Sequence, residues 1–468
     1  MARAAARLPA YDRAKVTPGI VHLGLGNFHR AHQATYTDDS LAADPGWGIR
    51  GVSLRSAAMA RALVPQDGLY TLGLRDAGGL QARVIGSVLT VISAADGMGP
   101  VLAALTDPAT RIVTLTVTEK GYCRDGAGDL DADHPDIRAD LLAPDAPRSA
   151  PGLLAVALRM RRDAGIPPFT VLSCDNLPAN GLAAARTVTQ MAELMAPRFA
   201  AWIAAHVAFP SSMVDRIVPA TTDADCAAMQ AATGLTDAWP VMTEPFTQWV
   251  IEDSFPTGRP SWPAAQLVGD VTPFETMKLR MLNGAHTTLA CFAQLLGVQT
   301  VAGAMDHPGL ARLVARVMDQ AAGTLDVPGA DLPGYAAALQ ARFRNPALHH
   351  ATAQIATDTS QKLPQRLLAP IRAAHDRGLP WDALALGVAA WIVLARDLPA
   401  ADPLSGTLAR IARAHPDPAD HAAAMLDLPM VFGDLREATW FREPVIAAVK
   451  RIATHGADAV IQGIAGNT

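Results

Sequence analysis

Lys278, Asn283 and His286 lie in one segment and have side chains suited to moving a proton to or from an alcohol. In an α-helix, at about 100° per residue, Lys278, His286 and Asn283 lie at about 0°, 80° and 140° around the axis, on one broad face. Burial disfavours the charged form of a lysine, so a shielded Lys278 could act as a base near neutral pH. Asn283 and His286 could hydrogen-bond the same oxygen and stabilise the charge that develops there.

The helix that would carry these residues has a recognisable start. Thr272 can cap it, Pro273 suits the first helical position, and Glu275 completes a capping box on the same arc as the lysine. We therefore expect one helix over residues 273–296. The spacing alone also fits a surface lysine beside a satisfied core histidine, so it does not by itself establish catalysis.

A glycine turn near the N-terminus indicates a dinucleotide. Gly24-Leu25-Gly26 follows a short apolar stretch and precedes an expected helix, a pattern in which the backbone can approach a pyrophosphate at the helix N-terminus. His29 stands where the usual fingerprint has its third glycine, so the turn also fits a ligand-free connection between strand and helix.

The end of the second expected strand bears on the choice of cofactor. An acidic residue there binds the adenosine ribose and repels a 2′-phosphate. Arg55 and Ser56 stand there in this chain, and Arg55 could pair with that phosphate. The pattern leaves NAD and NADP both open. The cofactor that we expect is NAD, contacted by Gly24, Gly26, Asn27, Phe28, Arg55, Ser56 and Glu119.

Strands and helices alternate in the first part of the chain. The expected strands cover Gly19–Gly26, Gly51–Leu54, Arg83–Ile92, Ile112–Val117 and Phe169–Ser173, with helical stretches such as Pro151–Asp163 between them, which favours a mostly parallel sheet. Later patterns are helical, over Pro273–Leu296, Gly309–Leu325, Tyr335–Phe343, Trp381–Leu394 and Glu443–Thr454. We expect an α/β fold with a Rossmann-like domain at residues 1–268 and a predominantly helical substrate domain at residues 269–468.

Composition argues against several kinds of partner. The chain has 468 residues and a formal net charge of −5, so we expect neither a nucleic-acid surface nor an anionic membrane partner. Its apolar runs, such as Ala383–Ala395, are too short for a bilayer span, and Met1–Arg13 lacks the pattern of a signal peptide. The 4 cysteines form no CxxC pair, so we expect a reducing cytoplasm and no structural zinc. We expect a monomer or small homo-oligomer.

Several segments together resemble the mannitol dehydrogenase family of polyol-specific long-chain dehydrogenases, along nearly the whole chain. The matching segments are Gly24-x-Gly26-x-Phe28-His29-Arg30-Ala31-His32, Ser173-Cys174-Asp175-Asn176, Phe209-Pro210-x-x-Met213-Val214-Asp215-Arg216-Ile217, Lys278-x-x-x-x-Asn283-x-x-His286 and Asp358-x-Ser360-x-Lys362. The Val-Asp-Arg-Ile segment and the Lys/Asn/His helix are the specific ones.

The resemblance implies a dehydrogenase that needs no metal, because an amine and two amides take the part that zinc plays elsewhere. Lys278 would be the general base, and Asn176 and Asn283 would polarise the reacting oxygen. The remaining implied roles belong to His286, Asp215 and Lys362, which would position substrate hydroxyls, and to Glu275, which would help a proton reach solvent.

The substrate divides the family into two branches. Mannitol 2-dehydrogenases carry an arginine eight residues before the lysine matched by Lys362, and this chain has Gln354 there. The run from Gln354 to Arg366 is more similar to fructuronate reductases, as are Thr116–Cys123 and Trp249–Asp253. The first reading is therefore D-fructuronate/D-mannonate, and the alternative is a polyol pair such as D-mannitol/D-fructose or D-arabinitol/D-xylulose.

A substrate carboxylate needs a cationic partner. Lys120, Lys362 and Arg366 are the candidates, and the sequence does not choose among them. An inactive homologue that only binds a sugar acid is the alternative of another class, and intact Lys278, Asn283 and His286 argue against it.

Overall fold

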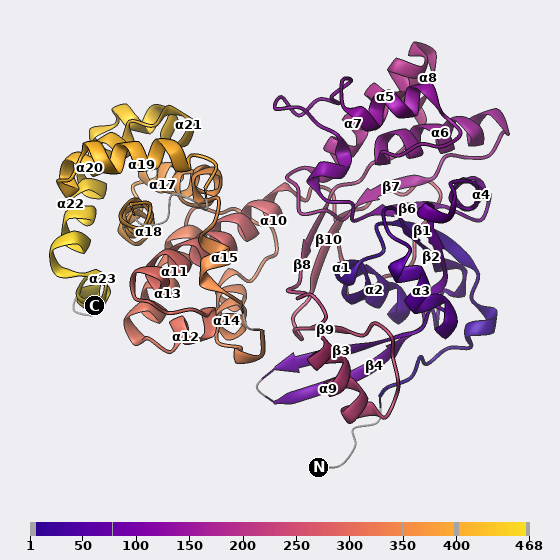
Figure 1. Cartoon of the computed structure of the whole chain (residues 1–468), viewed down its shortest axis with the longest axis horizontal. Helices are drawn as coiled ribbons and strands as arrows, with labels where there is room; N and C mark the ends of the chain where they lie inside the picture. The colour runs from indigo at the N-terminus through magenta and orange to yellow at the C-terminus, as the bar shows by residue number, and fades with distance from the viewer. Residues whose placement is uncertain (1–5, 77, 349, 397–401, 465–468) are drawn as a thin grey trace. The chain divides into compact units, whose positions relative to one another are not determined.

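The structure is a computed structural model that describes residues 6–76, 78–348, 350–396 and 402–464. The chain divides into two compact units, Met1–Thr272 and Pro273–Thr468. Figure 1 shows strands together with helices in the first unit and helices in the second.

The first unit is built on a parallel sheet with the strand order β5-β2-β1-β6-β7. These strands are β1 (Pro18–Leu23), β2 (Gly48–Ser53), β5 (Val88–Ser93), β6 (Ile112–Leu115) and β7 (Thr170–Ser173). The central strand β1 has β2 on one side and β6 on the other, so the strand order reverses there. Ligands of such sheets bind at this point, outside the carboxyl ends of the strands.

Both faces of this sheet are covered, because alternate residues of β1 enter two separate hydrophobic cores. Val21 and Leu23 point into a core shared with α4 (Gly99–Thr106), α6 (Ala150–Asp163) and α7 (Asn180–Met195). Ile20 points into the other core, with α2 (Gln33–Ser40) and α3 (Ala58–Leu63). Burial on both faces explains why these strands are apolar without interruption.

Two smaller sheets complete the first unit. One has the order β4-β3-β9 and the other β11-β10-β8. Their strands are β3 (Tyr70–Asp76), β4 (Gly79–Ile85), β8 (Ser212–Asp215), β9 (Val241–Thr243), β10 (Gln248–Glu252) and β11 (Gln266–Val268). The remaining α-helices of this unit are α1 (Asn27–Ala31), α5 (Pro135–Leu142), α8 (Pro197–His206) and α9 (Asp223–Thr233).

The single strand expected over Arg83–Ile92 is wrong. The chain forms β4 and β5, which pair in different sheets, β4 with β3 and β5 with β2. Between them the N–H of Gly86 donates to Oδ1 of Asp38 at 2.9 Å, and the hydroxyl of Ser87 donates to the carbonyl of Ala34 at 2.7 Å. These side-chain and main-chain bonds to α2 direct the chain from one sheet to the other.

The second unit is helical. Its first elements are α10 (Thr272–Met277), a turn at Lys278–Asn283, α11 (Gly284–Leu295), α12 (Val301–Met305), α13 (Pro308–Ala322), α14 (Leu332–Phe343), α15 (Thr352–Ala356) and α16 (Thr359–Leu363). A turn at Pro364–Leu368 follows, then α17 (Ala369–Asp376), α18 (Asp382–Leu394), α19 (Ser405–Ala414), α20 (Pro418–Leu426), α21 (Pro429–Phe432), α22 (Thr439–His455) and α23 (Ala457–Gly463).

Helices α11 and α18 pack against each other and form the centre of this unit. Nearly every residue of both is buried, and the apolar run at Ala383–Ala395 lies on α18 and its end. Among the described residues, no helix has the length and apolar character that a bilayer crossing needs.

Two turns of the second unit are π-helical rather than α-helical. They are Lys278–Asn283 and Pro364–Leu368, in which the N–H groups of Gly284 and Ala369 donate to the carbonyls of Leu279 and Pro364, five residues earlier. The helix expected over residues 273–296 is present from Thr272 to Leu295, but its turn at Lys278–Asn283 is π-helical rather than α-helical. A π turn holds one residue more than an α turn, so Lys278 and Asn283, five apart, come nearly above each other instead of at about 140°.

Candidate active site

A pocket of the first unit lies at the carboxyl ends of β1, β2 and β6, where a dinucleotide was expected. Gly24 and Gly26 follow β1, Arg55 follows β2, and Thr116–Thr118 follow β6. The other lining residues are Leu25, Ser53, Leu54, Lys120, Gly121, Cys123, Asp136, Arg148, Ser149 and Ala150. Three cations therefore border the pocket, from Arg55, Lys120 and Arg148.

The two glycines of the turn serve different purposes. Gly24 has φ of 99°, and a Cβ there would lie 2.2 Å from the carbonyl oxygen of Thr116, so the fold itself requires glycine. A Cβ on Gly26 would meet only the carbonyl of Gly24, at 3.7 Å. The protein leaves the space above Gly26 open, as expected where a pyrophosphate lies against the backbone.

His29 occupies the position of the missing third glycine and is fully buried. Its ring stacks on that of His22 from β1, with centroids 3.4 Å apart and planes 15° apart. Burial lowers the pKa of His22 to about 3 and that of His29 well below its ordinary value, so both rings are neutral. A flat pair of imidazoles joins helix to strand where other chains use a glycine.

The other expected cofactor residues lie around the turn rather than in the pocket lining. The amide of Asn27 donates to Thr221 Oγ1 at 3.1 Å and accepts from Arg30 at 2.7 Å, so its side chain serves the fold. Phe28 stacks on His32 with centroids 5.1 Å apart. Ser56 Oγ accepts the N–H of Ala58 at 3.1 Å, and Glu119 is exposed beside the lining residue Lys120.

Asp175 organises the loop after β6, a role that the sequence did not reveal. Its carboxylate accepts hydrogen bonds from the N–H groups of Val117 and Thr118, at 3.2 and 2.7 Å, and from the hydroxyl of Tyr122 at 2.8 Å. Burial raises the pKa of Asp175, while these hydrogen bonds lower it. They hold Thr118 at a positive φ of 67°, beside the pocket, and Asn176 follows Asp175 at an exposed position.

Asp215 ends β8 and is 5% exposed. The next residue, Arg216, donates to the carbonyl of Glu244 through Nη2 at 2.9 Å and also to that of Ala31. The carboxylate of Glu244 in turn accepts the N–H of Ile217 at 2.7 Å. Arg216 and Ile217 thus tie the backbone after Asp215 to the end of α1 and to the residue after β9.

In the second unit, Lys278, Asn283 and Glu275 are partly exposed, whereas His286 is buried. The ring of His286 stacks on Phe343, with centroids 4.5 Å apart, and meets the edge of His350. Burial, with smaller effects of His350, Arg342 and Arg366, lowers its pKa well below the ordinary value. Its Nε2 is buried and has no hydrogen-bond partner among the described residues.

Gln354, Lys362 and Arg366 come from α15, α16 and the second π turn. Lys362 Nζ donates to the carbonyls of Ile355 and Thr357, just after the exposed Gln354. Arg366 Nη1 donates to Thr287 Oγ1 at 3.1 Å, and Thr287 lies next to His286 on α11. The structure thus brings His286 and Arg366 together and ties Lys362 to the end of α15.

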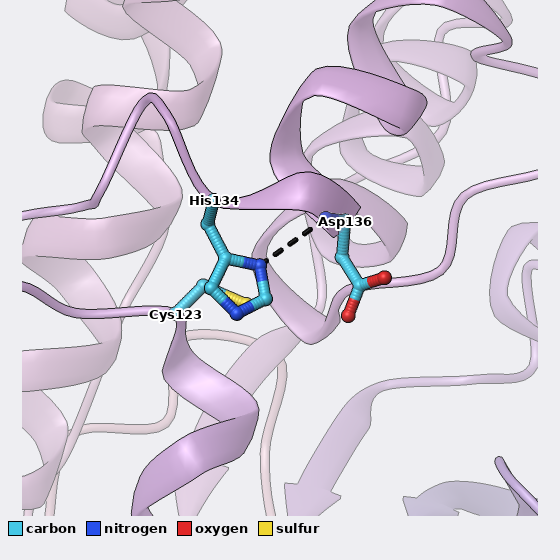
Figure 2. A group of neighbouring side chains, drawn as sticks. All are labelled: Cys123, His134 and Asp136. Carbon is cyan, nitrogen blue, oxygen red and sulfur yellow. Dashed lines mark hydrogen bonds between the residues drawn. The ribbon is translucent and has the colours of Figure 1, made fainter.

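Cys123, His134 and Asp136 form a group that could suggest a metal site, with ligand atoms within 4.8 Å of one another (Figure 2). The N–H of Asp136 donates to Nδ1 of His134 at 3.2 Å, which caps α5. Nε2 therefore keeps the ring proton, whereas a metal-ligating histidine donates through its other nitrogen. The geometry favours a helix cap at the edge of the pocket.

The fold and these sites define a nicotinamide-dependent oxidoreductase that acts on CH–OH groups. Two family descriptions match the chain, "Mannitol dehydrogenase Rossmann domain" over residues 18–264 and "Mannitol dehydrogenase C-terminal domain" over residues 270–453. The protein belongs to the mannitol dehydrogenase family.

Its relatives include enzymes of both substrate branches. An uncharacterized oxidoreductase of Escherichia coli K12, YeiQ, is 44% identical, over 96% of this chain and 95% of its own. The D-mannonate oxidoreductase of Escherichia coli K12 is 43% identical, over 96% of each chain. The solved mannitol 2-dehydrogenase of Pseudomonas fluorescens, a ternary complex with NAD and D-mannitol, is 35% identical, with a TM-score of 0.83 and coverage of 99% and 97%.

The space above Gly26 yields a first prediction. Gly26→Ala meets no protein atom closer than 3.7 Å, so its melting temperature should stay within a few degrees of the parent. The added methyl should raise the Kd for NADH at least about tenfold, because it occupies the approach of the pyrophosphate. NADH fluorescence titration measures the Kd, and Gly406→Ala, with nothing within 4 Å, is the control. Unchanged binding by Gly26→Ala would place the pyrophosphate elsewhere.

Proposed function

We propose that the protein interconverts a ketose-type sugar acid and its aldonate, D-fructuronate and D-mannonate, with NAD. The observation that carries this choice is the Arg366 guanidinium beside His286. Burial lowers the pKa of Arg366 to about 10, so the side chain stays charged at neutral pH. It forms no ion pair within the described residues, where its side-chain acceptor is the Thr287 hydroxyl.

A half-buried cation without a counter-charge is costly, and an anionic ligand removes most of that cost. A guanidinium also offers two parallel donors that match a carboxylate. Both arguments support a substrate with a carboxylate rather than a neutral polyol. The D-mannonate oxidoreductase among the relatives acts on a compound of this class by its name.

The other two candidate cations, Lys120 and Lys362, have other partners or lie in another pocket. Lys120 lines the pocket of the first unit with the glycine turn, where phosphates of the cofactor are its natural partners. Lys362 donates to two main-chain carbonyls, and burial together with the nearby Arg366 lowers its pKa. Arg366 is therefore our candidate for the substrate carboxylate, with Lys362 and Gln354 beside the substrate hydroxyls.

The proton chemistry that we propose begins at Lys278. Its neutral amine takes the hydroxyl proton of the aldonate, the C–H bond breaks, and a carbonyl forms at the same carbon. The nicotinamide ring supplies the hydride acceptor. Asn176 and Asn283 donate hydrogen bonds to the oxygen as charge develops. Asp215 and His286 hold neighbouring hydroxyls, and Glu275 passes the proton from Lys278 to solvent.

The π turn supports this assignment for Lys278 and Asn283. Residues five apart face the same side of such a turn, so an amine and an amide can address one oxygen. π turns inside helices are rare and are frequently found at functional sites. The placing of reactive groups is a reason to retain such a turn although it costs stability.

The carboxylate assignment predicts a selective effect of Arg366→Gln. The KM for fructuronate should rise about 30-fold or more, because the ligand loses a charge-assisted bond in a partly dry site. The kcat/KM for fructose, which has no carboxylate, should change less than about threefold. NADH consumption measures both. In the parent enzyme, a kcat/KM for fructose above that for fructuronate would instead assign the polyol branch.

The base assignment predicts that Lys278→Ala loses about 10³-fold in kcat for oxidation, within the range that general acid–base groups contribute. Binding of NADH, followed by fluorescence, should not change. Lys450→Ala, an exposed lysine on α22, is the matched control and should turn over normally. Turnover by Lys278→Ala within a few fold of the parent would remove this residue from the role of base.

The cofactor assignment concerns Arg55. NAD is supported by the complex of the Pseudomonas fluorescens relative. Arg55 and Arg148 line the same pocket, and their positive charges could also bind the 2′-phosphate of NADP. We expect Arg55→Asp to reduce kcat/KM with NADPH more than tenfold and to leave the value with NADH within about threefold. Equal losses with both cofactors would show that Arg55 contacts a group that they share.

A further inference from the structure

Gly284 lies where the two π turns touch. Its N–H donates the last i→i+5 hydrogen bond of the Lys278–Asn283 turn, to Leu279. A Cβ on Gly284 would lie 2.7 Å from the carbonyl oxygen of Arg366, closer than real Cβ contacts, and that oxygen is main chain. Only glycine therefore allows the turn that carries Lys278 to lie directly on the backbone of Arg366.

The second π turn is held from the opposite side as well. Leu367, fully buried, follows Arg366, and its Cδ2 lies 3.6 Å from the Cβ position of Gly284. Its Cδ1 lies 3.0 Å from the Cβ position of Gly387, on α18. Leu367 is thus packed between two glycines, so the backbone next to it has little freedom to move.

The side chain of Arg366 is tied to the same helix as Gly284. It donates to Thr287 Oγ1 at 3.1 Å, and Thr287 is three residues after Gly284 on α11. The main chain of Arg366 therefore contacts Gly284, and its side chain bonds Thr287. Both residues lie on α11, the helix that continues from Lys278 and Asn283. The two turns form one rigid pair.

We propose that Gly284 determines substrate specificity by fixing the separation between the turn of Lys278 and the turn of Arg366. The inference rests on the proposed function, since Lys278 acts at the reacting carbon and Arg366 binds the carboxylate. A sugar acid must contact Lys278 and Arg366 at the same time. The separation of the two turns therefore selects substrates by the distance between their carbonyl and their carboxylate. A neutral ketose engages the base without the guanidinium and does not sense that distance.

The smallest test is Gly284→Ala. The new methyl must push the Arg366 carbonyl away by several tenths of an ångström, and catalysis is sensitive to displacements of this size. We expect kcat/KM for fructuronate to fall at least about 20-fold and that for fructose to fall less than about threefold. A role in stability alone would lower both values by the same factor, because it would change only the fraction of folded enzyme.

Two further measurements make the test independent of activity. Amide hydrogen exchange at residues 284 and 369, which close the two π turns, should accelerate at least tenfold in Gly284→Ala. Gly406→Ala, whose Cβ has nothing within 4 Å, should match the parent in exchange and in both kcat/KM values. Equal losses for both substrates, or unchanged exchange at both positions, would overturn the inference.

The outcomes for the two proposals are distinguishable. If the parent enzyme does not reduce fructuronate, the proposed function fails, while the exchange data still decide whether Gly284 couples the two turns. If the parent reduces fructuronate and Gly284→Ala keeps the parent ratio of kcat/KM for fructuronate to that for fructose, the proposed function stands and the role of Gly284 in specificity is rejected.

Discussion

The structure depends on close approach of backbone to backbone at positions that tolerate no side chain. At Gly24 the turn after β1 lies on the carbonyl of Thr116, and at Gly284 one π turn lies on the carbonyl of Arg366. At either position, the Cβ of any other residue would collide with a main-chain carbonyl oxygen, so the main chain itself would have to shift. The Gly24 contact positions the glycine turn beside the pocket, and the Gly284 contact lies between the turn of Lys278 and that of Arg366, so backbone packing helps to position both.

Asp175 in the first unit and His286 in the second differ in how completely their polar atoms are paired. Asp175 is buried and fully used, with acceptor bonds from two N–H groups and a hydroxyl. His286 keeps an unpaired ring nitrogen, and Arg366 keeps a charge without an ion pair among the described residues. An unpaired buried polar group costs free energy, and scaffold residues such as His29 also carry that cost. It is the charge of Arg366 without a counter-ion, rather than an unpaired atom alone, that fits an anionic ligand.

The sequence predicts the fold class from strands that alternate with helices, and the structure confirms the parallel sheet and the helical second unit. It misplaces local detail where tertiary contacts decide. Residues 83–92 look like one strand because their β-branched pattern is continuous, yet bonds from Gly86 and Ser87 to α2 divide it. The π turn at Lys278 has no signature in residue type, so a regular helix was the natural expectation.

The candidate site is predictable only as a set of residues. The glycine turn and the Lys/Asn/His spacing predict candidate side chains, because they are local patterns. Three-dimensional information is needed to see that Thr287 and Gly284 hold Arg366, since 79 residues separate Arg366 from Thr287. It is also needed to see that Lys120 borders the pocket at the carboxyl ends of β1, β2 and β6 and that Lys362 donates to main-chain carbonyls.

Whether the substrate is a polyol or a sugar acid depends on where the second unit places a positively charged side chain. A neutral amide at Gln354 means that α15 offers hydrogen bonds without a charge, whereas the π turn offers a guanidinium with no counter-ion among the described residues. The second arrangement has a cost that only an anion removes. A neutral polyol would leave that charge uncompensated in every step of turnover. A carboxylate would neutralise it on binding, and this electrostatic argument is the basis of our proposal that the substrate is an aldonate.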